Sequence, residues 1–68
     1  MVDHVYKIIE IVGSSKKSSD DAIEKAVAKA GKTLHNLDWF EVQEVRGHIV
    51  DGKVGHYQVK LKIGFRLD

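Results

Sequence analysis

The residues best suited to chemistry in this chain gather around Trp39, its single tryptophan. Trp39 lies in a segment that alternates like a β-strand, and the alternation puts it on the polar face. Its polar neighbours on that face are Glu41, Gln43 and Gln58. A large aromatic side chain on a non-core face needs a cover. The pattern therefore predicts either a flat ligand stacked on Trp39 or a neighbouring subunit packed over it.

The loop GSSKKSS at residues 13–19 is a second candidate for chemistry, because it precedes a predicted helix. Hydroxyls, lysines and backbone amides at a helix start are groups that bind phosphate. The segment lacks the second glycine of the Walker pattern, so we favour a solvated turn followed by a helix cap. A secondary anion contact stays open as the alternative.

The remaining titratable residues predict neither a metal site nor a catalytic site. The four histidines are spread along the chain without a close-spaced ligand pair. Glu41 and Glu44 fall on opposite faces of one predicted strand, which excludes shared acid–base work within one subunit. No serine, histidine and acid grouping can be assembled from the spacing. We therefore expect a protein that is not an enzyme and holds no metal.

Length and cysteine content indicate how the chain is stabilised. Its 68 residues predict a single domain over 1–68, and a chain of this size buries only about 60% of its unfolded surface. It contains no cysteine, which rules out a disulfide or a thiolate zinc site. Association with further copies of itself is the remaining source of stability, so we expect a homo-oligomer.

The balance of acidic and basic residues argues against nucleic acid and membrane surfaces as binding partners. The chain has 11 basic and 10 acidic residues, a formal net charge of +1, and therefore no single-sign field for nucleic acid or a membrane surface. Charged residues interrupt the first apolar segment, which excludes a signal peptide, and no apolar run approaches the length of a membrane span. We expect a cytoplasmic protein.

Changes in hydrophobic period divide the chain into strands and one helix. The predicted strands are residues 4–12, 39–50 and 53–67. The first strand is expected to end in a loop at residues 13–15. The helix that follows is capped by Ser18 or Ser19, and Leu34 joins its apolar face if it continues past Gly31. That face is formed by Ile23, Ala26, Val27 and Ala30.

Asp51-Gly52 predicts a type I′ turn between the second and third strands. Counting outward from the turn pairs Val50 with Lys53. The same count pairs Gly47 with His56, Val45 with Gln58, Gln43 with Lys60, Glu41 with Lys62, and Trp39 with Gly64. On the reverse face Phe40 and Val42 meet Ile63 and Leu61, and we expect the helix to pack on this apolar surface.

The third strand has the longest alternation, so we place it in the centre of the sheet, antiparallel to both neighbours. The predicted fold is α+β with the order β-α-β-β, in which one helix packs on a three-stranded antiparallel sheet. Gly64 opposite Trp39 leaves room either for the indole to fold across it or for a ligand plane. Arg46 is expected on the helix side and Arg66 on the Trp39 side, and either could bind a phosphate.

These segments resemble the dodecins, small flavin-binding proteins, over nearly the whole chain. The resemblance rests on YKIIEIVGSS at 6–15, DWFEV at 38–42, VRGHIVDG at 45–52 and YQVKLKIGFRL at 57–67. It implies a β-α-β-β fold in which the three-stranded antiparallel sheet wraps around one helix. It also implies a hollow shell of twelve subunits that stores or buffers flavin in the cytoplasm without catalytic turnover.

By the same resemblance, Trp39 would stack on the isoalloxazine ring, with two flavins between symmetry-related tryptophans. Gln58 would hydrogen-bond the polar edge of the ring, and Arg46 and Arg66 suit the phosphate of FMN. Riboflavin is the other candidate flavin, and some dodecins also bind coenzyme A at subunit junctions. The alternative is a structural or interaction module, in which the Trp39 face is only an oligomer interface.

Overall fold

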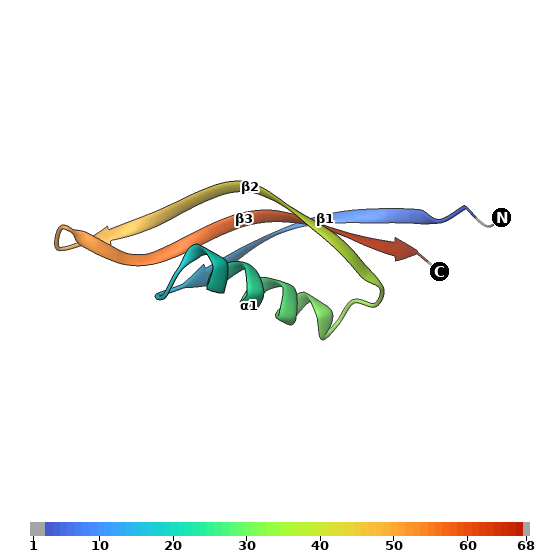
Figure 1. Ribbon diagram of the computed structural model, residues 1–68, viewed down its shortest axis with the longest axis horizontal. Coiled ribbons are helices and arrows are strands. Elements are labelled where there is room, and N and C mark those ends of the chain that lie inside the picture. The colour runs from blue at the N-terminus through green and yellow to red at the C-terminus, as the bar shows by residue number, and fades with distance from the viewer. Residues whose placement is uncertain (1–2, 68) are drawn as a thin grey trace.

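The chain forms three strands and one helix in the computed structural model, which describes residues 3–67 (Figure 1). The elements are β1 (Val5–Ser15), α1 (Ser19–Gly31), β2 (Leu37–Val50) and β3 (Lys53–Leu67). The strands form one antiparallel sheet in the order β1-β3-β2. The predicted α+β class, the β-α-β-β order and the central position of the third strand are confirmed.

Side-chain hydroxyl and carboxylate groups define the start of α1. Ser18 is the N-cap, and its Oγ accepts a hydrogen bond from the Asp21 N–H at 3.0 Å. Asp20 and Asp21 lie in the first turn, where the helix dipole favours negative charge. The helix ends at Gly31 and does not continue to Leu34.

The buried face of α1 is a stripe of alanines that lets the helix approach the sheet closely. The buried core consists of Ala22, Ala26, Ala30, Val59, Leu61 and Ile63. A Cβ atom at Gly13 would collide with the Ala22 carbonyl, so glycine is needed where β1 passes under the helix. Residues 13–15 belong to β1, and the predicted loop there is wrong because they continue the ladder opposite Val59, Gln58 and Tyr57.

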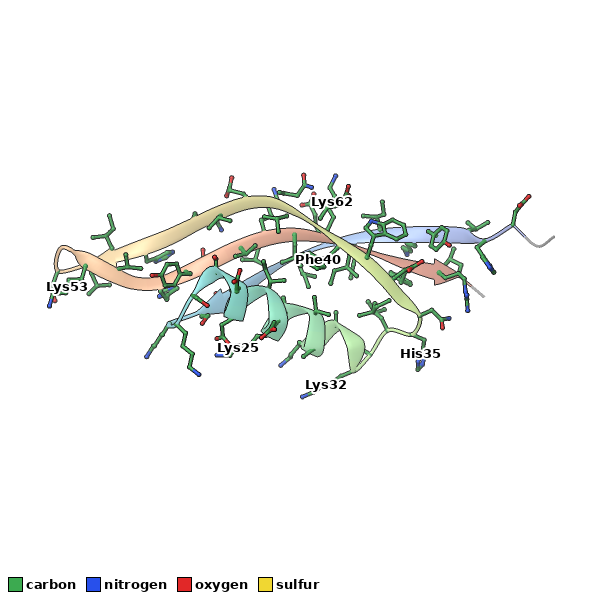
Figure 2. All side chains as sticks on the ribbon, in the orientation of Figure 1. Lys25, Lys32, His35, Phe40, Lys53 and Lys62 are labelled. Carbon is green, nitrogen blue, oxygen red and sulfur yellow. The ribbon has the colours of Figure 1, made fainter. Side chains whose placement is uncertain are left out.

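The helix covers β1 and β3 and leaves the inner face of β2 largely open (Figure 1). The residues between β1 and α1 are few, so the helix returns over β1 and the neighbouring strand β3. Phe40 and Val42 remain 49% and 44% exposed. The predicted packing of the helix on this apolar surface is confirmed for Leu61 and Ile63, which share the buried core with the helix, and wrong for Phe40 and Val42. Phe40 does point toward the helix side (Figure 2).

The ladder between β2 and β3 contains irregularities that change the middle of the predicted register. Trp39 with Gly64, Glu41 with Lys62 and Val50 with Lys53 are paired as predicted. The register shifts between Val42 and Glu44 and shifts back between His48 and Ile49. The predicted partners of Gln43, Val45 and Gly47 are therefore wrong; the observed pairs include Glu44–Lys60, Val45–Val59, Arg46–Gln58, Gly47–Tyr57 and His48–His56.

Candidate functional site

Trp39 is held in one orientation by two neighbours on the face of the sheet away from α1. Its indole lies directly over Gly64, where a Cβ atom would collide with the six-membered part of the ring. The Tyr6 ring packs edge-on against the indole, with centroids 5.1 Å apart and planes at 64°. The Trp39 side of the sheet thus carries a fixed aromatic plane that is 37% exposed.

This contact explains Gly64. The structure supports the interpretation that Gly64 leaves room for the indole to fold across it, because the indole of the same chain occupies the space above the glycine. The alternation of β1 places Tyr6 on this face, opposite Arg66. Sequence reasoning missed Tyr6; the signal that could have found it is the alternation of the first strand, which puts Tyr6 on the same face as His4 and Glu10.

Gln58 is fixed by Arg46 across β2 and β3. Arg46 Nε donates a hydrogen bond to Gln58 Oε1 at 3.0 Å, and Arg46 Nη1 lies 3.2 Å from Glu44 Oε1. The irregularity at Gln43 moves Arg46 onto the Trp39 face, so its predicted position on the helix side is wrong. Because the Gln58 oxygen already accepts from the guanidinium, the Nε2 amide group is the part left to face a ligand as a donor.

The irregularity at Gln43 also changes which face of the sheet the carboxylates of β2 occupy. Glu41 and Glu44 pair with Lys62 and Lys60, which are two positions apart on β3 and share one face. The expectation that the two glutamates lie on opposite faces is therefore wrong. Lys62 projects from the side of the sheet away from α1 (Figure 2), and Lys60 lies 3.6 Å from Glu10. Opposite charges alternate across this face of the sheet.

The four predicted site residues fall into two groups at separate places on the same face. Arg66 belongs with Trp39, since it lies two positions beyond Gly64 on β3, and its N–H donates to the Asn36 carbonyl at 3.0 Å. Gln58 belongs with Arg46. From Gly64 back to Gln58 is 64 − 58 = 6 positions of β3, or about 20 Å at ~3.3 Å per residue. The structure does not bring Trp39 and Gln58 together within one protomer.

Within residues 3–67 no group of three or more histidine, aspartate or glutamate side chains is arranged to hold a metal ion. Over the same residues, no helix is long and apolar enough to cross a membrane.

Comparison with known proteins identifies the family to which this geometry belongs. The family model described as Dodecin matches residues 5–68. The chain belongs to the dodecin family. Dodecins are small, non-enzymatic flavin-binding proteins, and the expectation of a protein without catalytic turnover agrees with this membership.

Individual dodecins match over nearly the full length. The Dodecin of Thermus thermophilus is 53% identical over 64 residues, which are 94% of this chain and 93% of the relative. The solved structure of the dodecin from Streptomyces davaonensis is 52% identical with a TM-score of 0.95, covering 98% of each chain. That of the Streptomyces coelicolor dodecin is 53% identical with a TM-score of 0.95, covering 100% of this chain and 97% of that one.

Proposed function

We propose that this dodecin stores and buffers a flavin in the cytoplasm, with FMN or riboflavin stacked on Trp39 between subunits of a hollow assembly of twelve. The observation that supports the proposal best is the fixed indole. It lies over the Gly64 backbone and in T-shaped contact with Tyr6, and Trp39 remains 37% exposed, which leaves surface for a planar partner. A preorganised aromatic plane binds a flat ring with little loss of side-chain freedom.

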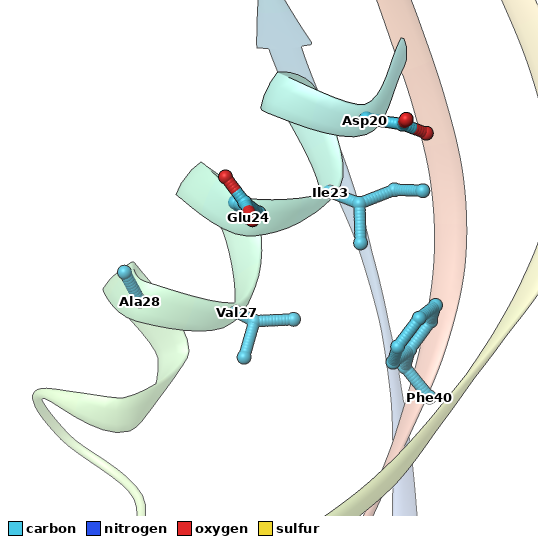
Figure 3. Close-up of a pocket in the computed structure, with 6 residues that line it drawn as sticks. All are labelled: Asp20, Ile23, Glu24, Val27, Ala28 and Phe40. Carbon is cyan, nitrogen blue, oxygen red and sulfur yellow. The ribbon is translucent and has the colours of Figure 1, made fainter.

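Oligomerisation follows from apolar surface that one chain cannot cover. On the inner side, Phe40 faces Ile23 and Val27 across an open cleft of about 650 Å³ (Figure 3). On the Trp39 side, Ile8 and Val12 are each about half exposed. Exposed apolar residues on both faces of so small a chain favour burial between subunits.

Hydrogen bonding would select the flavin ring. The pyrimidine part of an isoalloxazine carries carbonyl oxygens at its edge, and the Gln58 amide N–H groups can donate to them. Arg46 keeps the carboxamide in the orientation that presents those donors. Arg66, next to Trp39 in the sheet, is suited to the phosphate of FMN. Coenzyme A remains a candidate second ligand at subunit junctions.

The second candidate function is a structural or interaction module in which a neighbouring subunit covers Trp39. The exposed Ile8 and Val12 on the same face favour it, because an apolar interface could extend over the indole. The two functions differ in one observable. A flavin store purifies as a yellow protein whose bound flavin has quenched fluorescence, whereas the interaction module is colourless and does not take up added FMN or riboflavin.

Replacing Trp39 with alanine tests the proposed site. We expect flavin affinity to fall at least about tenfold, because stacking contributes about 0.5–1.5 kcal/mol beyond the area buried. Fluorescence titration measures the affinity, and native mass spectrometry shows whether twelve subunits still assemble. His35→Ala serves as the control, since His35 lies in the connection between α1 and β2. Unchanged FMN affinity and quenching in the Trp39 variant would rule out stacking on this residue.

A further inference from the structure

Tyr6 is in direct contact with the residue proposed to stack on the flavin. Its ring and the Trp39 indole meet in a T-shaped arrangement, with centroids 5.1 Å apart. The two residues come from β1 and β2, which lie on either side of β3, and the indole extends across Gly64 to reach the tyrosine. A phenylalanine would fill the same space as Tyr6. The tyrosine adds a phenolic O–H group, and this group can take part in chemistry.

The pair joins the two kinds of side chain in this protein that lose an electron most readily. The sequence has one tryptophan, two tyrosines and no cysteine. The second tyrosine, Tyr57, is 64 − 57 = 7 positions from Gly64 along β3, which is about 23 Å at ~3.3 Å per residue and on the other face of the sheet. Within one protomer, the indole therefore touches the phenol of Tyr6 and is remote from that of Tyr57.

A flavin stacked on Trp39 exposes the indole to oxidation whenever light is absorbed. An excited flavin is a strong one-electron oxidant, and an electron-rich ring in stacking contact with it is the nearest electron donor. The transfer of one electron quenches the fluorescence and leaves the indole as a radical cation. An indole radical that is not reduced again reacts with oxygen, and the aromatic plane is lost.

We propose that Tyr6 returns an electron to oxidised Trp39 and thereby protects the flavin-stacking residue from damage. This inference rests on the proposed flavin-binding function. One electron moves from the phenol to the indole radical cation, the phenolic O–H bond breaks, and the proton goes to solvent water. The products are an intact indole, a neutral tyrosyl radical and a hydrated proton. The step is favourable because the neutral tyrosyl radical is the more stable of the two radicals at neutral pH.

The exposure of Tyr6 suits both the loss of the proton and the repair of the radical. Tyr6 is 40% exposed, so water reaches the residue that releases the proton. A soluble thiol reaches it as well and donates a hydrogen atom to the tyrosyl oxygen, which restores the phenol and leaves a thiyl radical in solution. The unpaired electron thus leaves the flavin site through Tyr6.

Pulse radiolysis of the flavin-free protein tests the electron transfer without the cofactor. Azide radicals remove one electron from tryptophan, and the tryptophan and tyrosyl radicals have separate absorption bands. In the unmodified protein, we expect the tryptophan radical to decay as the tyrosyl radical rises, at a rate that does not depend on protein concentration. Tyr6→Phe keeps the ring but lacks the O–H group, so the delayed rise should be lost. Tyr57→Phe is the matched control and should retain it.

Continuous illumination of the FMN-loaded protein in the presence of a thiol tests the protection. Mass spectrometry of the peptide that contains Trp39 measures the oxidised tryptophan. We expect oxidation to accumulate faster in Tyr6→Phe than in the unmodified protein or in Tyr57→Phe. Fluorescence titration beforehand sets equal FMN occupancy in the three proteins.

The results that would overturn the proposal differ from those that would overturn flavin storage. A tyrosyl signal that is absent from the unmodified protein, or that persists in Tyr6→Phe, would exclude Tyr6 as the electron donor. Equal oxidation of Trp39 in the three FMN-loaded proteins would exclude the protective role. Failure of FMN to bind the unmodified protein would instead overturn the proposed function, and the flavin-free measurement would still report on Tyr6.

Discussion

At the scale of single residues, Gly64 decides how Trp39 is used. The indole needs the space that a side chain on Gly64 would fill, and the Tyr6 ring packs against it in a T-shaped contact. The tryptophan is therefore part of a three-residue arrangement from three strands, and its plane is set before any ligand arrives. Preorganisation of this kind keeps the ordering cost of binding low.

Gly64→Ala tests this arrangement. The new Cβ collides with the indole, so Trp39 must swing away from the sheet. We expect flavin affinity to fall about tenfold and stability to fall by about 1–3 kcal/mol, the usual cost of overpacking. Flavin titration and thermal unfolding measure the two effects.

Gly31→Ala is the control for Gly64→Ala, because a Cβ at Gly31 would meet only Leu37 Cδ1 at an ordinary 3.7 Å. If the Gly64 variant binds FMN with full affinity and full quenching, the position of the indole over Gly64 has no role in the site.

At the scale of elements, the junction between β1 and α1 is closed by one hydroxyl and one carboxylate. The buried Ser15 Oγ donates to Asp21 Oδ2 at 2.5 Å, and Lys25 lies 3.0 Å from the same oxygen. The hydrogen bond from Ser15 is the main cause that lowers the pKa of Asp21 below its ordinary value, with Lys25 adding to it. The charged form of Asp21 thus stabilises the contact between the start of α1 and the end of β1.

The lowered pKa of Asp21 predicts how stability depends on pH. A carboxyl group with a lowered pKa in the folded state stabilises the fold above its unfolded-state pKa, and this stability is lost as the pH falls through the folded value. We expect the melting temperature of the unmodified protein to exceed that of Asp21→Asn at pH 7. The difference should shrink below about pH 4.

Thermal unfolding from neutral to acid pH measures this difference, and Asp20→Asn in the same helical turn is the control. A constant difference between the unmodified protein and Asp21→Asn down to acid pH would show that the charge of Asp21 does not stabilise the junction.

At the scale of the whole molecule, the proposed ring site has to be assembled from different subunits. Trp39 and Gln58 lie at separate places along the sheet, about 20 Å apart by strand position. The open inner face of β2 and the exposed apolar residues beside Trp39 provide surfaces for a neighbouring copy. A two-fold axis, at which one patch meets its own copy, would bring the Gln58 of one subunit to the Trp39 of another.

Mixing two variants tests this assembly of the site. Subunits carrying Trp39→Ala and subunits carrying Gln58→Ala are refolded together, so that some mixed interfaces contain one intact tryptophan and one intact glutamine. We expect flavin binding to return in part, above the level of either variant alone. Differently tagged subunits and native mass spectrometry verify that mixed assemblies form. Verified mixed assemblies that bind no better than the separate variants would place the site within one chain.

The sequence alone predicted the fold and both ends of the β2–β3 register. Alternation separates the two faces of each strand, the helical period of the alanine stripe defines α1, and Asp51-Gly52 sets the turn. These signals are local, because each depends on the residues of one segment. They sufficed to place Trp39 opposite Gly64 on the polar face.

Only the tertiary structure decided what lies in the middle of the β2–β3 ladder. Between Trp39 and Val50, Gln43 on β2 and Gly55 on β3 are the residues that the ladder leaves without a partner, and because they lie on opposite strands their shifts cancel outside this segment. Between them every pair moves by one position, which turns Arg46 and His48 onto the Trp39 face. Gln43 is followed by a second polar residue, Glu44, and either could be the extra residue between Val42 and Val45, so the hydrophobic pattern cannot locate it. The pairing of β2 with β3 makes that choice, and it places Arg46 on Gln58.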